Sequence, residues 1–298
     1  MGRLHDDEVD TDAALVRRLV RRSFPQWSDL PISRLESGGT VNAVYRLGSL
    51  LTVRLPLTEG GTKDLEKERR WLPALAPLLP VAIPEVVGIG APGEGYPWPW
   101  SVHRWIEGVN PVEGRVVAPT QLARDLAGFV RTLRKADVAG GPPAYRGVPL
   151  SRVDTATRDA ITQLGESFDA VALEAAWQES LSADPWTGPP VWVHSDLMPS
   201  NLLVRDARLA AVIDFSTAGV GDPACDLIPA WGLLPTHARE VFRAEVDVDD
   251  ATWARGRGWA LSMAAIQLPY YRTTNPVISA NARHVLHEVL AQGSLRDR

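Results

Sequence analysis

The chain has 298 residues, of which 45% are hydrophobic, and a formal net charge of −5 at pH 7. This length lies near the size at which one hydrophobic core divides into two, so we expect two lobes. The negative charge argues against a nucleic-acid backbone or an anionic membrane as a partner. The single cysteine, Cys225, excludes an intrachain disulfide, and no apolar run approaches about 18 residues. We therefore expect a cytoplasmic protein.

The first 107 residues alternate short β-like runs with turns. Apolar residues at helical spacing predict an amphipathic helix over residues 11–22, whose arginines form a solvated face, and a second helix over 63–78. The β-like runs cover residues 31–36, 40–47, 50–55, 84–87 and 100–106. Glycine-containing turns separate the first three runs, which predicts an antiparallel meander.

After residue 107 the pattern becomes mostly helical, so we place the boundary between the two lobes at 1–107 and 108–298. Helical patterns cover 121–135, 151–167, 169–180 and the tail from Thr236, where Pro269 and Pro276 are expected to break the helices. Apolar runs at 191–193, 202–204 and 209–215 predict strands between them. The segment after residue 107 carries four of the five excess negative charges, which favours a cationic ligand there.

The strongest chemical signal is the run HSDLMPSN at residues 194–201, followed by Ile213-Asp214-Phe215. Phosphoryl transfer needs a base that positions a hydroxyl and oxygen ligands that hold Mg²⁺. Asp196 can accept the hydroxyl proton, while the Asn201 amide and the Asp214 carboxylate can hold the metal. The apolar runs between these ligands predict a hairpin that brings both of them to one end of a sheet.

At these motifs the sequence resembles the aminoglycoside phosphotransferases and their choline-kinase-like relatives, which share the protein-kinase fold. The family pattern continues with Gly-Asp-Pro and a later Asp, present here as Gly221-Asp222-Pro223 and Asp226. Ser195 stands where the family usually has Gly. The resemblance implies an α+β fold of two lobes, a small N-terminal antiparallel β lobe with a helix and a larger, mostly helical C-terminal lobe.

The resemblance also suggests roles for residues beside the motif. His194 is expected to brace the loop, and no second His or Cys lies at a spacing that would favour a zinc site. Asp222 and Asp226 are expected to be scaffolding residues, with Asp226 accepting hydrogen bonds from the backbone N–H groups of the catalytic loop.

The N-terminal lobe is expected to bind the nucleotide. A two-glycine hairpin alone is more often only a turn, but here a cation and a carboxylate follow it at the positions that kinases use for the phosphates. The cation is Arg54, where the family usually has Lys, and the carboxylate is Glu68. The expected nucleotide-binding residues are Ser37, Gly38, Gly39, Thr40, Arg54 and Glu68, together with the backbone of Arg104, Trp105 and Ile106 at the base. The tryptophans near this segment are interpreted as core residues.

These features predict an enzyme that moves the γ-phosphoryl group of ATP or GTP to a hydroxyl of a small molecule with Mg²⁺. By resemblance, an aminoglycoside is the first expected acceptor, and a macrolide or an endogenous metabolite is the alternative. Residues 267–272 and 148–167 are expected to line its site. Two rival hypotheses are a catalytically silent nucleotide-binding module, suggested by Arg54, and a metal-dependent hydrolase built on His194 and Asp196.

Overall fold

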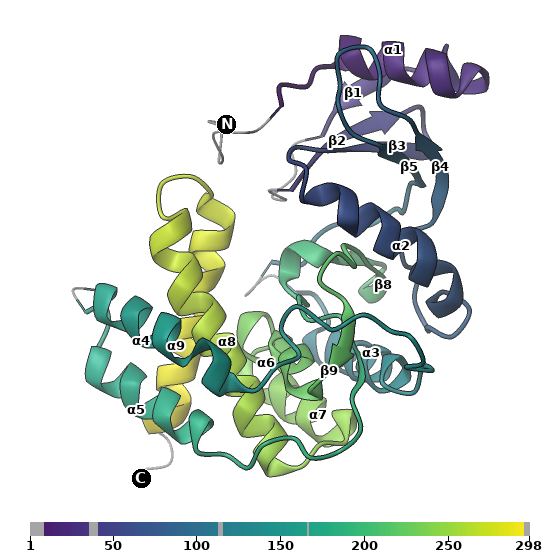
Figure 1. Cartoon of the computed structure of the whole chain (residues 1–298). Coiled ribbons are helices and arrows are strands. Elements are labelled where there is room, and N and C mark those ends of the chain that lie inside the picture. Colours follow the sequence, from purple (N-terminus) through teal and green to yellow (C-terminus); the bar gives the residue numbers. More distant parts are fainter. Residues whose placement is uncertain (1–8, 36–40, 113–115, 166, 295–298) are drawn as a thin grey trace. The chain divides into compact units, whose positions relative to one another are not determined.

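The computed structural model describes residues 9–35, 41–112, 116–165 and 167–294 (Figure 1). The chain forms two compact units, which are treated separately below. The first unit comprises Met1–Pro77, Ala82–Glu107 and Ile213–Ser216, and the second comprises Leu78–Val81, Gly108–Val212 and Thr217–Arg298. The predicted α+β class is confirmed, because a five-stranded sheet dominates the first unit and helices dominate the second. No helix within the described ranges has the length and apolar character needed to span a membrane.

The first unit is built on one antiparallel sheet with strand order β1-β2-β3-β5-β4. A tight turn joins β2 and β3, and Gly48 adopts the left-handed φ of 60° that this turn requires. The strands are β1 (Ile32–Arg34), β2 (Asn42–Leu47), β3 (Leu51–Pro56), β4 (Val86–Gly90) and β5 (Trp100–Arg104).

One face of this sheet packs against helix α1 (Ala13–Ser23) and forms the core of the unit. Tyr45, Val53 and Val102 lie opposite one another on adjacent strands and are fully buried. The close approach of Trp100 to its strand partner Gly90 leaves no room for a side chain, since a Cβ there would lie 2.0 Å from the indole ring. Trp100 is therefore a core residue, as the sequence indicated.

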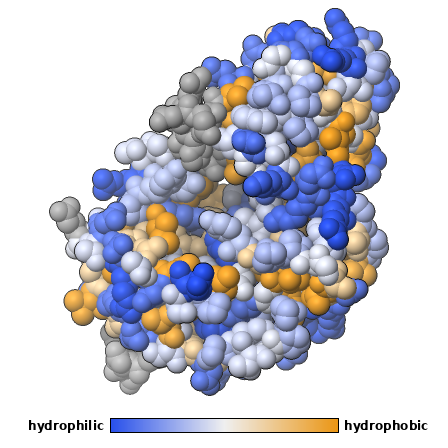
Figure 2. All heavy atoms as spheres, in the orientation of Figure 1, coloured by the Kyte–Doolittle hydropathy of each residue, from blue (hydrophilic) through white to orange (hydrophobic). Residues whose placement is uncertain are grey.

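The arginines of α1 lie away from the core. Leu15, Val16, Leu19 and Val20 are buried, whereas the exposed side of the helix is hydrophilic (Figure 2). This arrangement is the solvated basic face that the sequence predicted.

The opposite face of the sheet carries Arg54 and Ser101, which are paired across β3 and β5. Because side chains alternate along a strand, Arg54 points away from the face that buries Val53. Helix α2 (Gly61–Leu75) supplies the partner of Arg54. The first unit thus has one apolar face that stabilises it and one face that carries buried charge.

The second unit contains two small two-stranded antiparallel sheets and most of the helices. Strand β6 (Val191–Val193) pairs with β9 (Gly219–Gly221), and β7 (Leu202–Arg205) pairs with β8 (Arg208–Val212), both antiparallel. The hairpin predicted between residues 201 and 214 is therefore present. The helices are α3 (Pro119–Leu133), α4 (Asp154–Gln163), α5 (Ala170–Leu181), α6 (Pro229–Gly232), α7 (Thr236–Val246), α8 (Asp250–Tyr271) and α9 (Pro276–Ser294).

Two local predictions in this unit need correction. Helix α8 continues through Pro269 to Tyr271, so Pro269 does not break it. Because proline has no N–H, the last turn of the helix lacks one backbone hydrogen bond. The break predicted at Pro276 is present, because α8 ends at Tyr271 and Pro276 begins α9, a position where the absent N–H costs nothing. The helix predicted over 151–167 is shorter than expected, since its first turn is the 3-10 helix η2 (Leu150–Val153) and the chain leaves the helix at Leu164.

Candidate active site

The loop between β6 and β7 holds Asp196 in a fixed orientation. The side-chain nitrogen of Asn201 donates to the Oδ2 atom of Asp196 at 2.8 Å and to its backbone carbonyl at 2.9 Å. Asn201 ends the short 3-10 helix η3 (Pro199–Asn201), and that helix produces the spacing of five residues between the two side chains. The structure therefore brings together the predicted base and one predicted metal ligand.

Ser195 has a left-handed backbone conformation, with φ of 62°. This conformation costs a residue with a Cβ about 1–2 kcal/mol, which explains why glycine suits the position. Here the serine compensates through two contacts: its N–H donates to Asp226 Oδ1 at 2.7 Å, and its hydroxyl donates to the carbonyl of Thr217 at 2.8 Å. The departure from the family pattern is thus accommodated by a hydrogen bond that glycine cannot make.

Asp226 holds the backbone of the catalytic loop just before Asp196, as the sequence predicted. Its carboxylate is fully buried and accepts the backbone N–H groups of His194 at 2.9 Å and Ser195 at 2.7 Å. Burial raises the pKa of Asp226 to about 6, although the two N–H donors favour the charged form. His194 is also fully buried and its Nδ1 atom accepts the N–H of Asp196, which agrees with a bracing role.

Arg146 is a site residue that the sequence did not indicate. Its Nη1 atom donates to the Oδ1 atom of Asp196 at 3.0 Å and to the carbonyl of Ser195 at 3.0 Å. Both carboxylate oxygens of Asp196 are therefore held, one by Arg146 and the other by Asn201. The two ion-paired side chains are each about one-fifth exposed, so the pair is accessible from solvent.

The segment that carries Arg146 runs beside strand β9. Backbone bonds join Val220 to both Pro142 and Ala144, and Asp222 to Gly147. Gly221 lies so close to Gly147 that a Cβ would approach its carbonyl oxygen to 2.5 Å. The glycine of the Gly221-Asp222-Pro223 motif thus permits the close approach that positions Arg146.

Asp222 is the scaffolding residue that the sequence predicted. Its carboxylate caps the 3-10 helix η4 (Pro223–Leu227) through the N–H of Ala224 and pairs with Arg255 of α8 at 2.8 Å. Both ion-paired side chains are buried. Removing one partner would leave the other charge buried without compensation, so the pair fixes the motif to the helical part of the unit.

In the first unit, Arg54 pairs with Glu68 as expected of a kinase cation and its orienting carboxylate. The Nη1 atom of Arg54 lies 3.2 Å from Oε1 and 3.1 Å from Oε2 of Glu68. Burial alone would lower the pKa of Arg54, but the charges of Glu68 and then Asp214 outweigh it and leave the pKa raised. Burial raises the pKa of Glu68, and the charge of Arg54 opposes that shift.

Asp214 belongs to the same charged cluster in the first unit. The strand predicted over 209–215 ends at Val212, so Asp214 lies outside it, with φ of 63°. Its carboxylate acts electrostatically on Arg54, Asp64 and Lys67. Asp64 and Lys67 were not predicted. Burial lowers the pKa of Lys67, and the charges of Asp64, Glu68 and Asp214 oppose that shift.

The segment expected to bind the nucleotide base has its backbone partly engaged. The N–H of Arg104 donates to Glu85 and that of Trp105 to Leu50, whereas within the described part of the chain the N–H of Ile106 has no acceptor. The Arg104 side chain pairs with Glu85, and the guanidinium of Arg46 covers the Trp105 ring. The predicted phosphate loop, Ser37, Gly38, Gly39 and Thr40, lies outside the described residues.

The two predicted metal ligands, one in each unit, carry oxygen atoms of the kind that a hard divalent cation requires. Because Asn201 uses its nitrogen to hold Asp196, its amide oxygen is the atom left for a metal ion. Asp214 supplies a carboxylate, and Mg²⁺ prefers such oxygen ligands.

Comparison with known families decides the classification. The model of the phosphotransferase enzyme family, APH, matches residues 32–259, more than half of the chain. The chain belongs to this family. No curated protein matches the sequence.

Solved structures of small-molecule kinases share the fold of this phosphotransferase. The GDP and kanamycin complex of APH(2")-IIIa has a TM-score of 0.74 at 22% identity, covering 93% of this chain and 98% of that one. ADP-bound APH(2")-Ib has a TM-score of 0.63 at 16% identity, with 93% and 98% coverage. Macrolide 2'-phosphotransferase MphH from Brachybacterium faecium has a TM-score of 0.62 at 25% identity, with 92% and 97% coverage. These likenesses confirm the predicted protein-kinase-like fold.

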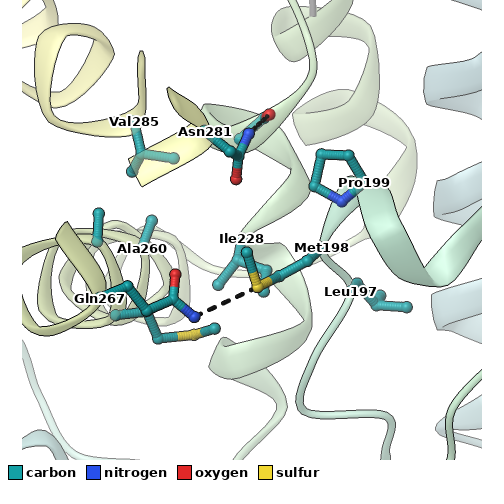
Figure 3. A pocket seen from close by; sticks show the side chains of 11 residues that line it. Leu197, Met198, Pro199, Ile228, Ala260, Gln267, Asn281 and Val285 are labelled. Carbon is teal, nitrogen blue, oxygen red and sulfur yellow. Dashed lines mark hydrogen bonds between the residues drawn. The ribbon is translucent and has the colours of Figure 1, made fainter. Parts of the chain in front are cut away.

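A pocket in the second unit of the phosphotransferase begins directly after Asp196. Leu197, Met198 and Pro199 of the catalytic loop form one side of it (Figure 3). Helices α8 and α9 supply most of the remainder, and the cavity volume is only about 20 Å³. Of the two segments predicted to line the acceptor site, 267–272 contributes Gln267 to this pocket, whereas 148–167 contributes Pro149, Leu150 and Ser151 to a second pocket of the same unit, which Gly147 and Asp222 also line.

Proposed function

We propose that the protein transfers the γ-phosphoryl group of ATP or GTP to a hydroxyl of a small molecule. The observation that carries the proposal is the restraint of Asp196, whose two carboxylate oxygens are held by Arg146 and Asn201 in a loop braced by Asp226. A base held in this way can align an acceptor hydroxyl and take its proton as the new P–O bond forms.

The other residues have roles that follow from their chemistry. Asn201 and Asp214 would hold Mg²⁺, which, when bound, would neutralise charge on the phosphates. Arg54, oriented by Glu68, would contact the phosphates, and Ser37 to Thr40 would supply backbone N–H groups to them. The N–H of Ile106 is the donor available to the base, with Arg104 and Trp105 shaping that segment. Such a site accelerates transfer by positioning and charge stabilisation.

Aminoglycoside and macrolide phosphotransferases both stand among the structural neighbours, and nucleotide complexes with GDP and ADP occur among them. An aminoglycoside is the acceptor that family resemblance suggests first, with a macrolide or a hydroxylated metabolite as the alternative. Arg54 in place of lysine motivates the rival hypothesis of a silent nucleotide-binding module. The formed pair between Arg54 and Glu68 supports an active site instead.

The test is a phosphotransfer screen of the purified protein with Mg²⁺, using ATP and GTP separately. Aminoglycosides, macrolides and small hydroxylated metabolites serve as acceptors, and mass spectrometry detects the gain of one phosphoryl group. We expect transfer to at least one acceptor class that disappears when Mg²⁺ is chelated. Nucleotide binding that is independent of metal and is accompanied by no turnover would support the silent module and contradict the proposal.

A further inference from the structure

The side chain of Asn110 holds the backbone on both sides of the predicted metal ligand Asn201. Its Nδ2 atom donates to the carbonyl oxygen of Ser200 at 2.8 Å and to that of Leu202, also at 2.8 Å. The carbonyl oxygen of Pro199 lies 3.3 Å from the same nitrogen. These carbonyls belong to the short helix η3 and to the residue that follows it. One amide therefore contacts the whole turn that carries Asn201.

The segment that carries Asn110 is itself fixed to the strand that follows this turn. Val109 and Val204 exchange two backbone hydrogen bonds, of 3.0 and 2.8 Å, in an antiparallel bridge. The backbone of Gly108 comes so close to β7 that a Cβ would lie 2.9 Å from the Cβ of Leu203. The segment thus pairs with β7, which also pairs with β8, and its backbone bonds determine where the Asn110 amide lies.

The contacts of Asn110 complement those of the Asn201 side chain. The Nδ2 atom of Asn201 donates to the backbone carbonyl of Asp196 at 2.9 Å and to its Oδ2 atom at 2.8 Å. The amide oxygen of Asn201 is the atom left for a metal ion. Because this side chain is short and occupies one rotamer, the place of its oxygen depends on where the backbone lies. Asn110 fixes that backbone.

A second set of contacts stabilises the opposite end of the same hairpin and provides a comparison. Asp125 of α3 accepts two hydrogen bonds of 2.8 Å from the Arg208 guanidinium and one of 3.1 Å from the N–H of Leu209. Arg208 lies next to the turn between β7 and β8, whereas Asn201 precedes the first residue of β7. Asp125 therefore stabilises the hairpin without contacting the residues that flank the predicted ligand.

We infer that Asn110 is a positioning residue for the metal site. Its amide fixes the turn that carries Asn201, so that the amide oxygen of Asn201 is directed at the cation that accompanies the nucleotide. This inference rests on the proposed function, in which Asn201 and Asp214 hold Mg²⁺, and adds a residue that acts through Asn201. Partners that orient metal ligands commonly contribute about tenfold to a hundredfold to metal affinity. Asn110 is exposed and acts through the backbone, so we expect about tenfold.

Calorimetric titration of the full chain tests the inference without turnover. The probes are the β,γ-imido analogues of ATP and GTP, each titrated with excess Mg²⁺ and again with EDTA. Asn110→Leu keeps a side chain of similar size but removes the N–H donors. It should weaken binding of the Mg²⁺-nucleotide analogue by about tenfold and leave binding of the metal-free analogue within twofold of wild type. Asn110→Gln, which keeps the amide, should recover part of the loss.

Arg208→Met is the matched control, because it weakens the same hairpin at its other end. It should lower the unfolding temperature and retain the gain in nucleotide affinity that Mg²⁺ gives the wild type. The inference would be overturned by equal losses for Asn110→Leu with and without Mg²⁺, by no loss, by an equal effect of Arg208→Met, or by a wild type whose affinity does not respond to Mg²⁺. A wild type that shows the Mg²⁺-dependent gain but phosphorylates no acceptor would contradict only the proposed function.

Discussion

Replacement of Arg146 by methionine tests whether restraint of the base matters for turnover. The substitution removes two hydrogen bonds, one to the Oδ1 atom of Asp196 and one to the carbonyl of Ser195, both 3.0 Å long. The hydrogen bond from Asn201 to the Oδ2 atom of Asp196 remains. A hydrogen bond to a charged group contributes about 1.5–3 kcal/mol, and partial exposure of this pair places it toward the lower end. If that energy is lost in the transition state, kcat falls by about tenfold to a hundredfold.

The assay is steady-state phosphotransfer at saturating nucleotide and acceptor, with nucleotide affinity measured separately. Arg146→Met should lower kcat and leave nucleotide affinity unchanged, because Arg146 lies in the second unit with the base. Arg146→Lys should recover part of the loss, since a single nitrogen makes both bonds. Arg152→Met, at an exposed arginine of the same region, is the matched control and should be silent. A kcat for Arg146→Met within twofold of wild type would refute the reasoning.

Three further substitutions test the supports of the site. Asp226→Asn should gain stability relative to wild type as the pH rises from 4 to 7, by up to about 3 kcal/mol. The reason is that the pKa of Asp226, raised to about 6, makes its ionisation costly in the folded state. Urea unfolding measures both proteins across this pH range, and a constant difference between their free energies of unfolding would contradict the prediction. Ser195→Gly should be more stable than Ser195→Ala by about 1 kcal/mol, since both lose the hydroxyl bond but only glycine relieves the left-handed strain, and equal unfolding free energies would be the opposing result. Arg54→Met should destabilise the protein by about 3–5 kcal/mol by leaving Glu68 buried and unpaired, whereas Arg54→Lys should retain most of the stability; thermal unfolding that ranks the two variants equally would oppose this.

Most of the site residues that could be predicted from the sequence lie in short linear motifs. Asp196 and Asn201 are five residues apart in one loop, and Asn201 ends the short helix η3, so their spacing alone indicated that they act together. The following hairpin fixes where β8 ends, and Asp214 comes two residues later. The class of fold followed from the change of periodicity near residue 107, because strands and helices leave different patterns of apolar residues.

Residues brought in by irregular segments could not be predicted in this way. Arg146 lies 50 residues before Asp196, in a segment without periodicity whose position depends on a close backbone contact with Gly221. Asn281 and Val285 line the pocket beside the catalytic loop from the last helix, and their place there depends on which face of α9 packs inward. Pro269 is a case in which local sequence misled: the general effect of proline predicted a break, but α8 continues through this residue.

The role of Asp196 as the base is tested most directly by Asp196→Asn, which keeps the shape of the side chain and removes its ability to take a proton. Product mass and nucleotide affinity are measured for wild type and variant with Mg²⁺, ATP or GTP, and an acceptor that the wild type phosphorylates. We expect transfer to fall by at least a factor of about 10² while nucleotide affinity changes little. Phosphotransfer by Asp196→Asn at a rate close to that of the wild type would contradict the assignment.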